Sequence, residues 1–230
     1  MKVLAAADIH GVTGVYEWLR GRALELKVDL VVLAGDLSGG SWDEEEQRRE
    51  ARTLVNLFKR FPVTTLYLMG NDDFFALDYE DGQVKPLHGR RLDFGGYGFV
   101  GYQYTTPFVG SLHERPEEEI EKDVKTLEPL LDNRTVLVTH GPAFGVLDRV
   151  YAGEHVGSHS LAALLARRPV LAHIHGHVEV VPLAPEALVD VAVDVGQHRS
   201  ARQKRRQRMR TDMLTCVDAI QHPESRAVSY

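Results

Sequence analysis

The chain has 230 residues, of which 43% are hydrophobic and 26% charged, values typical of a globular protein with one or two domains. Its single cysteine, Cys216, excludes an internal disulfide framework, and no apolar run reaches the ~20 residues of a membrane span. We therefore expect a cytoplasmic protein that has no membrane partner.

The charges are unevenly distributed around a formal net charge of −6. Seven of the 27 bases and no acid lie in residues 199–210, so 20 bases face 33 acids in the rest of the chain. An acidic body does not favour non-specific nucleic-acid binding. The basic run could contact nucleic acid, but a solvated tail is the preferred interpretation.

Short apolar runs alternate with stretches of helical periodicity along most of the chain. In chain order, strands are predicted at 3–7, 29–34, 64–69, 135–139 and 170–174, a hairpin at 91–94 and 97–102, and helices at 15–26, 42–61, 116–131 and 158–167. Closing strands are expected near Leu183 and over 187–195. The alternation predicts an α/β domain over 1–198, and a basic tail over 199–230 that is partly disordered or adds an edge strand at 213–217.

Polar residues follow the main strands directly, at the point where each strand ends. Because strand ends in open α/β sheets form binding crevices, these segments are expected to converge. Asp and His are ligands for divalent metals, and a carboxylate can bridge two ions about 3.5–4 Å apart that clamp a phosphoryl group. Each residue alone is more often a cap or turn former, but the ordered set favours a metal site. Its members are Asp8, His10, Asp36, Asn71, His140, His175 and His177.

The order D-x-H, G-D, G-N-x-D, H-G and G-H-x, which runs from Asp8 to Glu179, resembles the calcineurin-like metallophosphoesterases. Residues 140–158 resemble their small prokaryotic branch. The resemblance implies a four-layer αββα sandwich of mixed sheets, in the broad α/β (α+β) class. It also implies two divalent ions (Mn, Fe, Zn or Ni), which a hydroxide bridges before it attacks a phosphomonoester or phosphodiester. Asp8 and His10 would hold the first ion, Asp36 would bridge, and Asn71 and His140 would hold the second.

The last motif departs from the family pattern, because Glu179 stands where the second histidine of G-H-x-H belongs. In one register His177 binds the second ion and Glu179 the first; in the other, His175 and His177 form the pair. Residues 175, 177 and 179 share one side of an extended chain, so periodicity does not choose between them. The glycine before His177 slightly favours the first register, and His173 is the least expected ligand.

A second departure replaces the family's proton-donating histidine with Asp72. An aspartate near two cations is expected to be ionised and therefore a poor general acid, so substrates with good leaving groups would suffer least. His113 or His155 could replace it, and Asp73 is expected to orient a metal ligand.

Three functions follow as hypotheses. The leading one is a phosphatase or phosphodiesterase acting on a phosphate-ester small molecule or nucleotide. The second is a nuclease guided by residues 199–210, and the third is a degenerate metal-binding protein without activity. Tyr102, Tyr104 and Phe108 could stack on a base, although packing is the preferred role.

Overall fold

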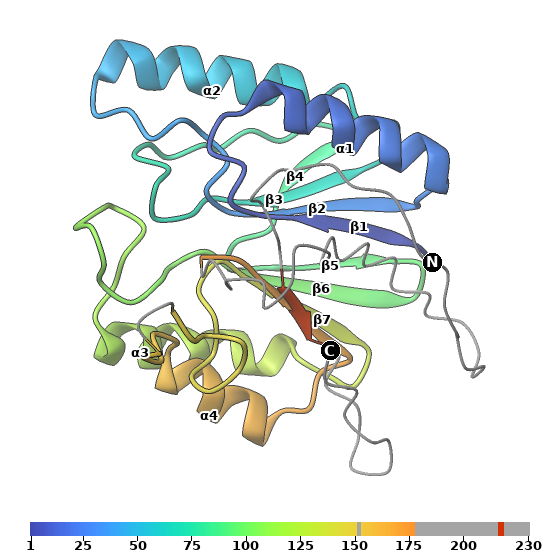
Figure 1. Cartoon of the computed structure of the whole chain (residues 1–230). Helices are drawn as coiled ribbons and strands as arrows, with labels where there is room; N and C mark the ends of the chain where they lie inside the picture. The colour runs from blue at the N-terminus through green and yellow to red at the C-terminus, as the bar shows by residue number, and fades with distance from the viewer. Residues whose placement is uncertain (151–152, 178–215, 219–230) are drawn as a thin grey trace.

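The computed structural model describes residues 1–150, 153–177 and 216–218 (Figure 1). The predicted closing strands near Leu183 and over 187–195 lie outside these residues, as do the 199–210 basic run and the proposed domain boundary at 198.

The first sheet consists of four parallel strands in the order β1 (Val3–Ala6), β2 (Leu30–Ala34), β3 (Thr65–Leu68) and β4 (Val84–Pro86). Helix α1 (Thr13–Leu26) connects β1 to β2, and α2 (Glu44–Phe58) connects β2 to β3. Strands β1 to β3 are short and rich in Val, Leu and Ala, as expected for parallel strands covered on both faces. Because the strands of this sheet are parallel, all their carboxyl ends lie at one edge of the sheet.

The second sheet is mixed, in the order β5 (Arg91–Phe94), β6 (Tyr97–Tyr102), β7 (Thr135–Thr139), β8 (Ala172–His175) and β9 (Cys216–Asp218). β5 and β6 form the predicted antiparallel hairpin, β6, β7 and β8 are parallel, and β9 pairs antiparallel with β8. Helix α3 (Glu117–Leu127) continues into a 3-10 turn (Glu128–Leu130), and α4 (His159–Arg167) precedes β8.

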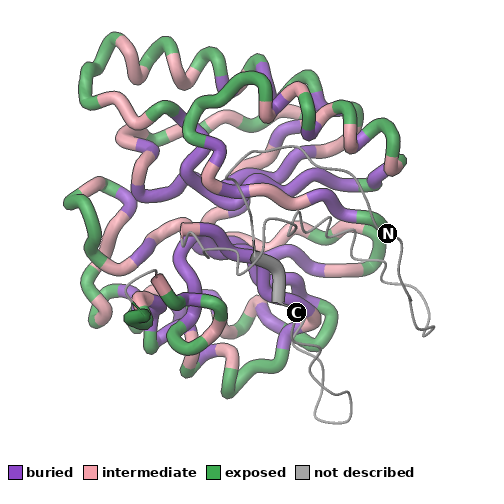
Figure 2. The backbone as a smooth tube through the Cα atoms, viewed as in Figure 1, coloured by how far each residue is buried: buried purple, intermediate pink, exposed green. Residues whose placement is uncertain are grey.

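The elements stack in four layers, helices on the two outer faces and the two sheets between them (Figure 1). Alternation along β2 explains the stacking, because successive side chains point to opposite faces. Val31 and Leu33 pack in the cluster with α1 and α2, whereas Leu30, Val32 and Ala34 pack in the cluster that joins the two sheets. A third cluster covers the other face of the second sheet with α3 and α4. Figure 2 shows the burial concentrated in the central strands. The predicted four-layer αββα class is confirmed.

Two element predictions need correction. The helix expected at 42–61 begins at Glu44, because the Asp43 carboxylate caps it by accepting a hydrogen bond from the backbone N–H of Glu46 (2.8 Å). Trp42 is therefore a loop residue. Strand β4 was not predicted, because Lys85 and Pro86 interrupt its apolar pattern; it forms as an edge strand on β3.

Among the described residues, no helix is both long enough and apolar enough to cross a membrane.

Gly101 lets β6 pass close to the segment that follows β4. A Cβ on Gly101 would lie 2.7 Å from both the Cγ atom and the carbonyl oxygen of Leu87. We expect Gly101→Ala to lower the free energy of unfolding by about 1–3 kcal/mol, since backbone atoms cannot move aside cheaply. In Gly21→Ala, the new Cβ meets open space on the exposed face of α1, so stability should rise by about 0.5–1 kcal/mol. Urea unfolding of both variants tests this, and equal effects would contradict it.

Candidate metal centre

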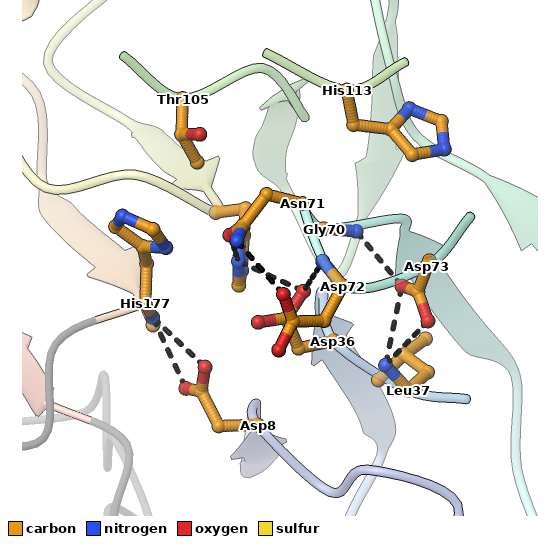
Figure 3. Close-up of polar contacts among 12 residues, drawn as sticks. Asp8, Asp36, Leu37, Gly70, Asn71, Asp72, Asp73, Thr105, His113 and His177 are labelled. Atoms are coloured by element: carbon orange, nitrogen blue, oxygen red, sulfur yellow. Dashed lines mark hydrogen bonds and ion pairs between the residues drawn. The ribbon is translucent and has the colours of Figure 1, made fainter. Parts of the chain in front are cut away.

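Loops at the carboxyl ends of strands from both sheets meet at one place (Figure 3). Backbone hydrogen bonds extend the strand pairing beyond the strands and hold these loops together. The Asp8 N–H donates to the Gly35 carbonyl (3.0 Å), and the Gly176 N–H donates to the His140 carbonyl (3.0 Å). Across the sheets, the backbone N–H of His177 donates to both carboxylate oxygens of Asp8, at 3.0 and 3.1 Å. The first strand and the last parallel strand are thus joined at the site.

Two groups of side chains bring metal-binding atoms together. Asp8, His10 and Asp36 form one, and Asp36, His140 and His177 form the other; in each group the ligand atoms lie within 4.8 Å of one another. Asp36 belongs to both groups. Asn71 adjoins the second, with its Oδ1 atom 3.0 Å from Nε2 of His140. Carboxylate, imidazole and amide donors of this kind fit a divalent transition metal.

A hydrogen bond to the backbone orients the ring of His140. Its Nδ1 atom lies 2.8 Å from the Ala34 carbonyl oxygen, and since a carbonyl only accepts, Nδ1 carries the proton. Nε2 therefore points toward Asn71 and toward Asp36, whose Oδ1 atom is 3.2 Å away. Such a bond on the far nitrogen aims histidine at a metal.

Asp73 connects the loop that follows β2 to the loop that follows β3. Its buried carboxylate accepts hydrogen bonds from the backbone N–H groups of Leu37 (3.0 Å), Ser38 (2.7 Å) and Gly70 (2.8 Å). These residues directly follow Asp36 or precede Asn71, so one side chain sets the distance between both ligand-bearing loops (Figure 3). The geometry agrees with the orienting role that the sequence suggested for Asp73.

Four of the candidate ligands have a left-handed backbone. The φ angles are 54° at Asp8, 48° at His10, 51° at Asp36 and 70° at His177. Non-glycine residues rarely adopt this conformation, which costs of order 1 kcal/mol or more and concentrates at functional sites. The sharp turns aim consecutive loop residues inward. The sequence carries only a weak signal of them, since Asp and His tolerate the conformation better than most residues.

Glycine is required where the ligand loops press together. A Cβ on Gly70 would lie 2.2 Å from Oδ1 of Asp36 and 2.6 Å from Nε2 of His140. A Cβ on Gly35 would lie 2.3 Å from Nδ1 of His140. A side chain at either position would therefore occupy the space of the ligand atoms themselves.

Burial and charge shift the protonation of the group. Burial alone would lower the pKa of His140, but the neighbouring Asp36 carboxylate outweighs it and raises that pKa to about 9. Burial raises the pKa of Asp8 to about 6, whereas burial and the charge of His140 lower the pKa of His177 to about 4. At pH 7 the metal-free site thus contains a protonated His140 and a neutral His177.

Asp72 lies at the half-exposed side of the site. Its backbone N–H donates to Oδ1 of Asp36 (2.8 Å), and its Oδ2 atom is 3.8 Å from Nδ1 of His10. Without metal, burial and the Asp36 carboxylate raise the pKa of Asp72. Bound cations would act in the opposite direction and favour the ionised carboxylate that the sequence predicts.

The two alternative proton donors differ in burial. His113 is buried, with Nε2 3.1 Å from the Phe75 carbonyl oxygen and Nδ1 3.2 Å from the Gln103 amide nitrogen, so both ring nitrogens are engaged. His155 is exposed, and its Nδ1 atom is 2.5 Å from the buried Asp148 carboxylate. Neither histidine belongs to the two ligand groups found among the described residues. The sequence did not single out Asp148 as a partner for His155.

The structure distinguishes the histidines of β8. His173 is buried, and its Nε2 atom is 2.8 Å from the Thr139 hydroxyl. His175 is also buried and, among the described residues, lies outside both ligand groups, whereas His177 belongs to one. His177 is a ligand in both predicted registers, so its position does not choose between them. His175 lies outside the ligand groups of the described residues, and the other possible partner, Glu179, lies outside the described residues, so the choice between these two stays a prediction.

A model of the calcineurin-like phosphoesterase family matches residues 1–180. The match to one solved structure has 18% sequence identity and a TM-score of 0.58, and it spans 77% of this chain and 84% of the chain in that structure. The structure of TT1561 from Thermus thermophilus, with 17% identity and a TM-score of 0.55, covers 74% and 78%. Both likenesses support the fold. A search of curated proteins finds no match.

Metal uptake should release a proton near neutral pH. Because the pKa of His140 is about 9 in the metal-free protein, a metal that binds Nε2 must displace the proton held there. We expect about one proton released at pH 7 and an affinity for Mn²⁺ that rises about tenfold per pH unit up to pH 9. Titration calorimetry in buffers of different ionisation enthalpy measures this. His159→Gln, at an exposed histidine, should behave as wild type. A heat independent of the buffer would contradict the expectation.

Proposed function

The chain belongs to the calcineurin-like phosphoesterase family, and we propose that it hydrolyses phosphate monoesters or diesters with two divalent ions that share Asp36. The observation that carries this proposal is the membership of Asp36 in both ligand groups. Among the described candidate ligands only Asp36 belongs to both groups, and the two oxygens of its carboxylate could each bind an ion. The alternative of a nuclease rests on residues 199–210, outside the described part, and stays a prediction.

The residues divide between the two proposed ion positions. Asp8 and His10 would hold the first, and Asn71, His140 and His177 would hold the second. Glu179, which lies outside the described residues, would complete the first in the register that the glycine before His177 favours. When bound, the ions would polarise the phosphate ester and lower the pKa of the attacking water. The chain supplies a rigid frame for this chemistry, because Asp73 ties the Asp36 and Asn71 loops together and Ala34 fixes the ring of His140.

Asp72 is the group we place beside the leaving oxygen. It neighbours Asp36 and His10 and is half-exposed, so a substrate can reach it. As an ionised carboxylate it would position a substrate hydroxyl rather than donate a proton. His155 is the second candidate donor, because it is exposed and Asp148 orients its Nδ1 atom, while Nη2 of Arg149 lies 3.4 Å from its Nε2 atom. Hydrolysis of esters with good leaving groups is therefore expected to dominate.

Replacing the shared carboxylate tests the proposal directly. We expect Asp36→Asn to lower kcat for p-nitrophenyl and bis-p-nitrophenyl phosphate at least a hundredfold with Mn²⁺, and to reduce the bound metal measured by elemental analysis. Glu118→Gln is the matched control, because Glu118 is an exposed acid in the first turn of α3, on the other sheet. Wild-type protein that holds about two ions without any turnover would instead support a degenerate binding protein.

The role of Asp72 predicts a dependence on the leaving group. In Asp72→His, an imidazole that can donate a proton replaces the carboxylate, so turnover of glycerol phosphate should rise about tenfold or more, while that of p-nitrophenyl phosphate changes little. The ratio of the two kcat values is the measurement. An equal change for both substrates would show that Asp72 does not lie beside the leaving group.

A further inference from the structure

Exposed apolar side chains gather on the loops around the metal centre. Among the described residues, nine large hydrophobic side chains are exposed, and seven of them lie on the loops that follow β1, β2, β6 and β7. Two of these are aromatic residues on loops that carry candidate ligands or contact one. Trp42 follows Asp36 on the β2 loop, and the Phe108 ring lies edge-on to the His177 ring, with centroids 5.6 Å apart. Clustered apolar exposure of this kind marks a binding surface.

Trp42 forms a flat surface that is held in place from behind. Its ring stacks on Phe74, with centroids 3.8 Å apart and planes 19° from parallel. Phe74 covers one face of the indole, yet Trp42 remains 67% exposed, so the other face and the edge are free in the described structure. Tryptophan is usually well buried, and burial of so large a ring would stabilise the fold. Because most of the Trp42 ring stays exposed, the ring contributes little to the stability of the fold.

The stacked pair is fixed relative to the metal ligands. Trp42 lies on the loop that begins with Asp36, and Phe74 follows Asn71 and Asp72. Between the two loops, the backbone of Gly40 is so close that a Cβ there would lie 3.2 Å from the Asp72 carbonyl oxygen and 3.7 Å from the Phe74 ring. The Gln47 amide also donates to the Ser41 carbonyl (3.0 Å), which holds the loop just before Trp42. The exposed indole is thus held against the loop that carries Asn71 and Asp72.

The charge beside Trp42 selects the kind of occupant. Residues 43–46 are four consecutive acids, and in the described structure Arg48 and Arg49 pair with three of them. Net negative charge repels an anionic membrane surface and the backbone of a long nucleic acid. A small substrate can keep its phosphate at the metal centre and its planar ring on the indole, away from these acids. A nucleobase is such a ring, and bases stack on exposed aromatic side chains without sequence preference.

We propose that Trp42, backed by Phe74, is the stacking subsite for the base of a nucleoside phosphate whose phosphate group lies at the metal centre. This inference rests on the proposed function, because it places the substrate phosphate among the metal ligands. It assigns Trp42 a role in specificity and leaves the bond-breaking step to the metal-centre residues.

A binding measurement tests the subsite without any turnover. The chain contains two tryptophans, so in Trp18→Phe the fluorescence reports Trp42 alone. We expect adenosine 5′-monophosphorothioate, with Mg²⁺ present, to quench this fluorescence in a saturable way, because the base stacks on the indole. Ribose 5-phosphate, which has the same charge and no base, should leave it unchanged. Absence of quenching by the nucleotide, or equal quenching by both, would overturn the proposal.

A kinetic comparison separates the subsite from the chemistry. Thymidine 5′-monophosphate p-nitrophenyl ester and methyl p-nitrophenyl phosphate share a leaving group and differ in the nucleoside. We expect Trp42→Ala to lower kcat/KM about tenfold for the nucleoside ester alone, Trp42→Phe to retain most of it, and Trp18→Ala to resemble wild type. An equal effect on both esters would overturn the subsite. Wild-type protein that cleaves neither ester nor p-nitrophenyl phosphate, yet shows the quenching, would overturn the proposed function and leave the subsite standing.

Discussion

The negative charge gathered around Asp36 is the constraint on which the rest of the site depends. Burial and the charge of Asp36 both raise the pKa values of Asp8, Asp72 and Asp73. Among the described residues, the ion pairs recorded for this group come from His10 and His140. In the metal-free protein, the proton on His140 offsets part of the repulsion. Divalent cations would offset far more of it, so the loops are built for ions that the protein chain itself cannot replace.

Much of this arrangement could be predicted from the sequence, because the signals were local. Buried strands followed directly by Asp, His or Asn located the site edge, and the resemblance of these motifs to the calcineurin-like family implied the four layers. The start of α2 was wrong, since Asp43 caps the helix from a position that periodicity alone counted as helical. That error concealed the exposure of Trp42. β4 was missed because its pairing with β3, rather than its composition, makes it a strand.

Other features depend on contacts between distant segments and leave no pattern in the sequence. The engaged ring nitrogens of His113 require Phe75 and Gln103, which only the fold brings close. The same is true of the hydrogen bond that aims His140 at the site, whose acceptor, Ala34, lies 106 residues earlier. His177 belongs to a ligand group and His175 does not, although strand alternation places both on one side; the backbone turns at residue 177, where φ is 70°. Residue types indicated the chemistry, and long-range packing determined which candidates reach it.

The left-handed backbone at Asp8, His10, Asp36 and His177 also limits how this site can change in evolution. At such positions glycine, asparagine and aspartate are tolerated, whereas β-branched residues are strained. A lineage that lost its metal chemistry would therefore tend to keep a small polar residue or glycine at each of these four positions. The backbone shape of the loops would then be retained after the metal ligands were lost. Asparagine or glycine at several of these four positions in a relative would indicate descent from a metal-binding protein.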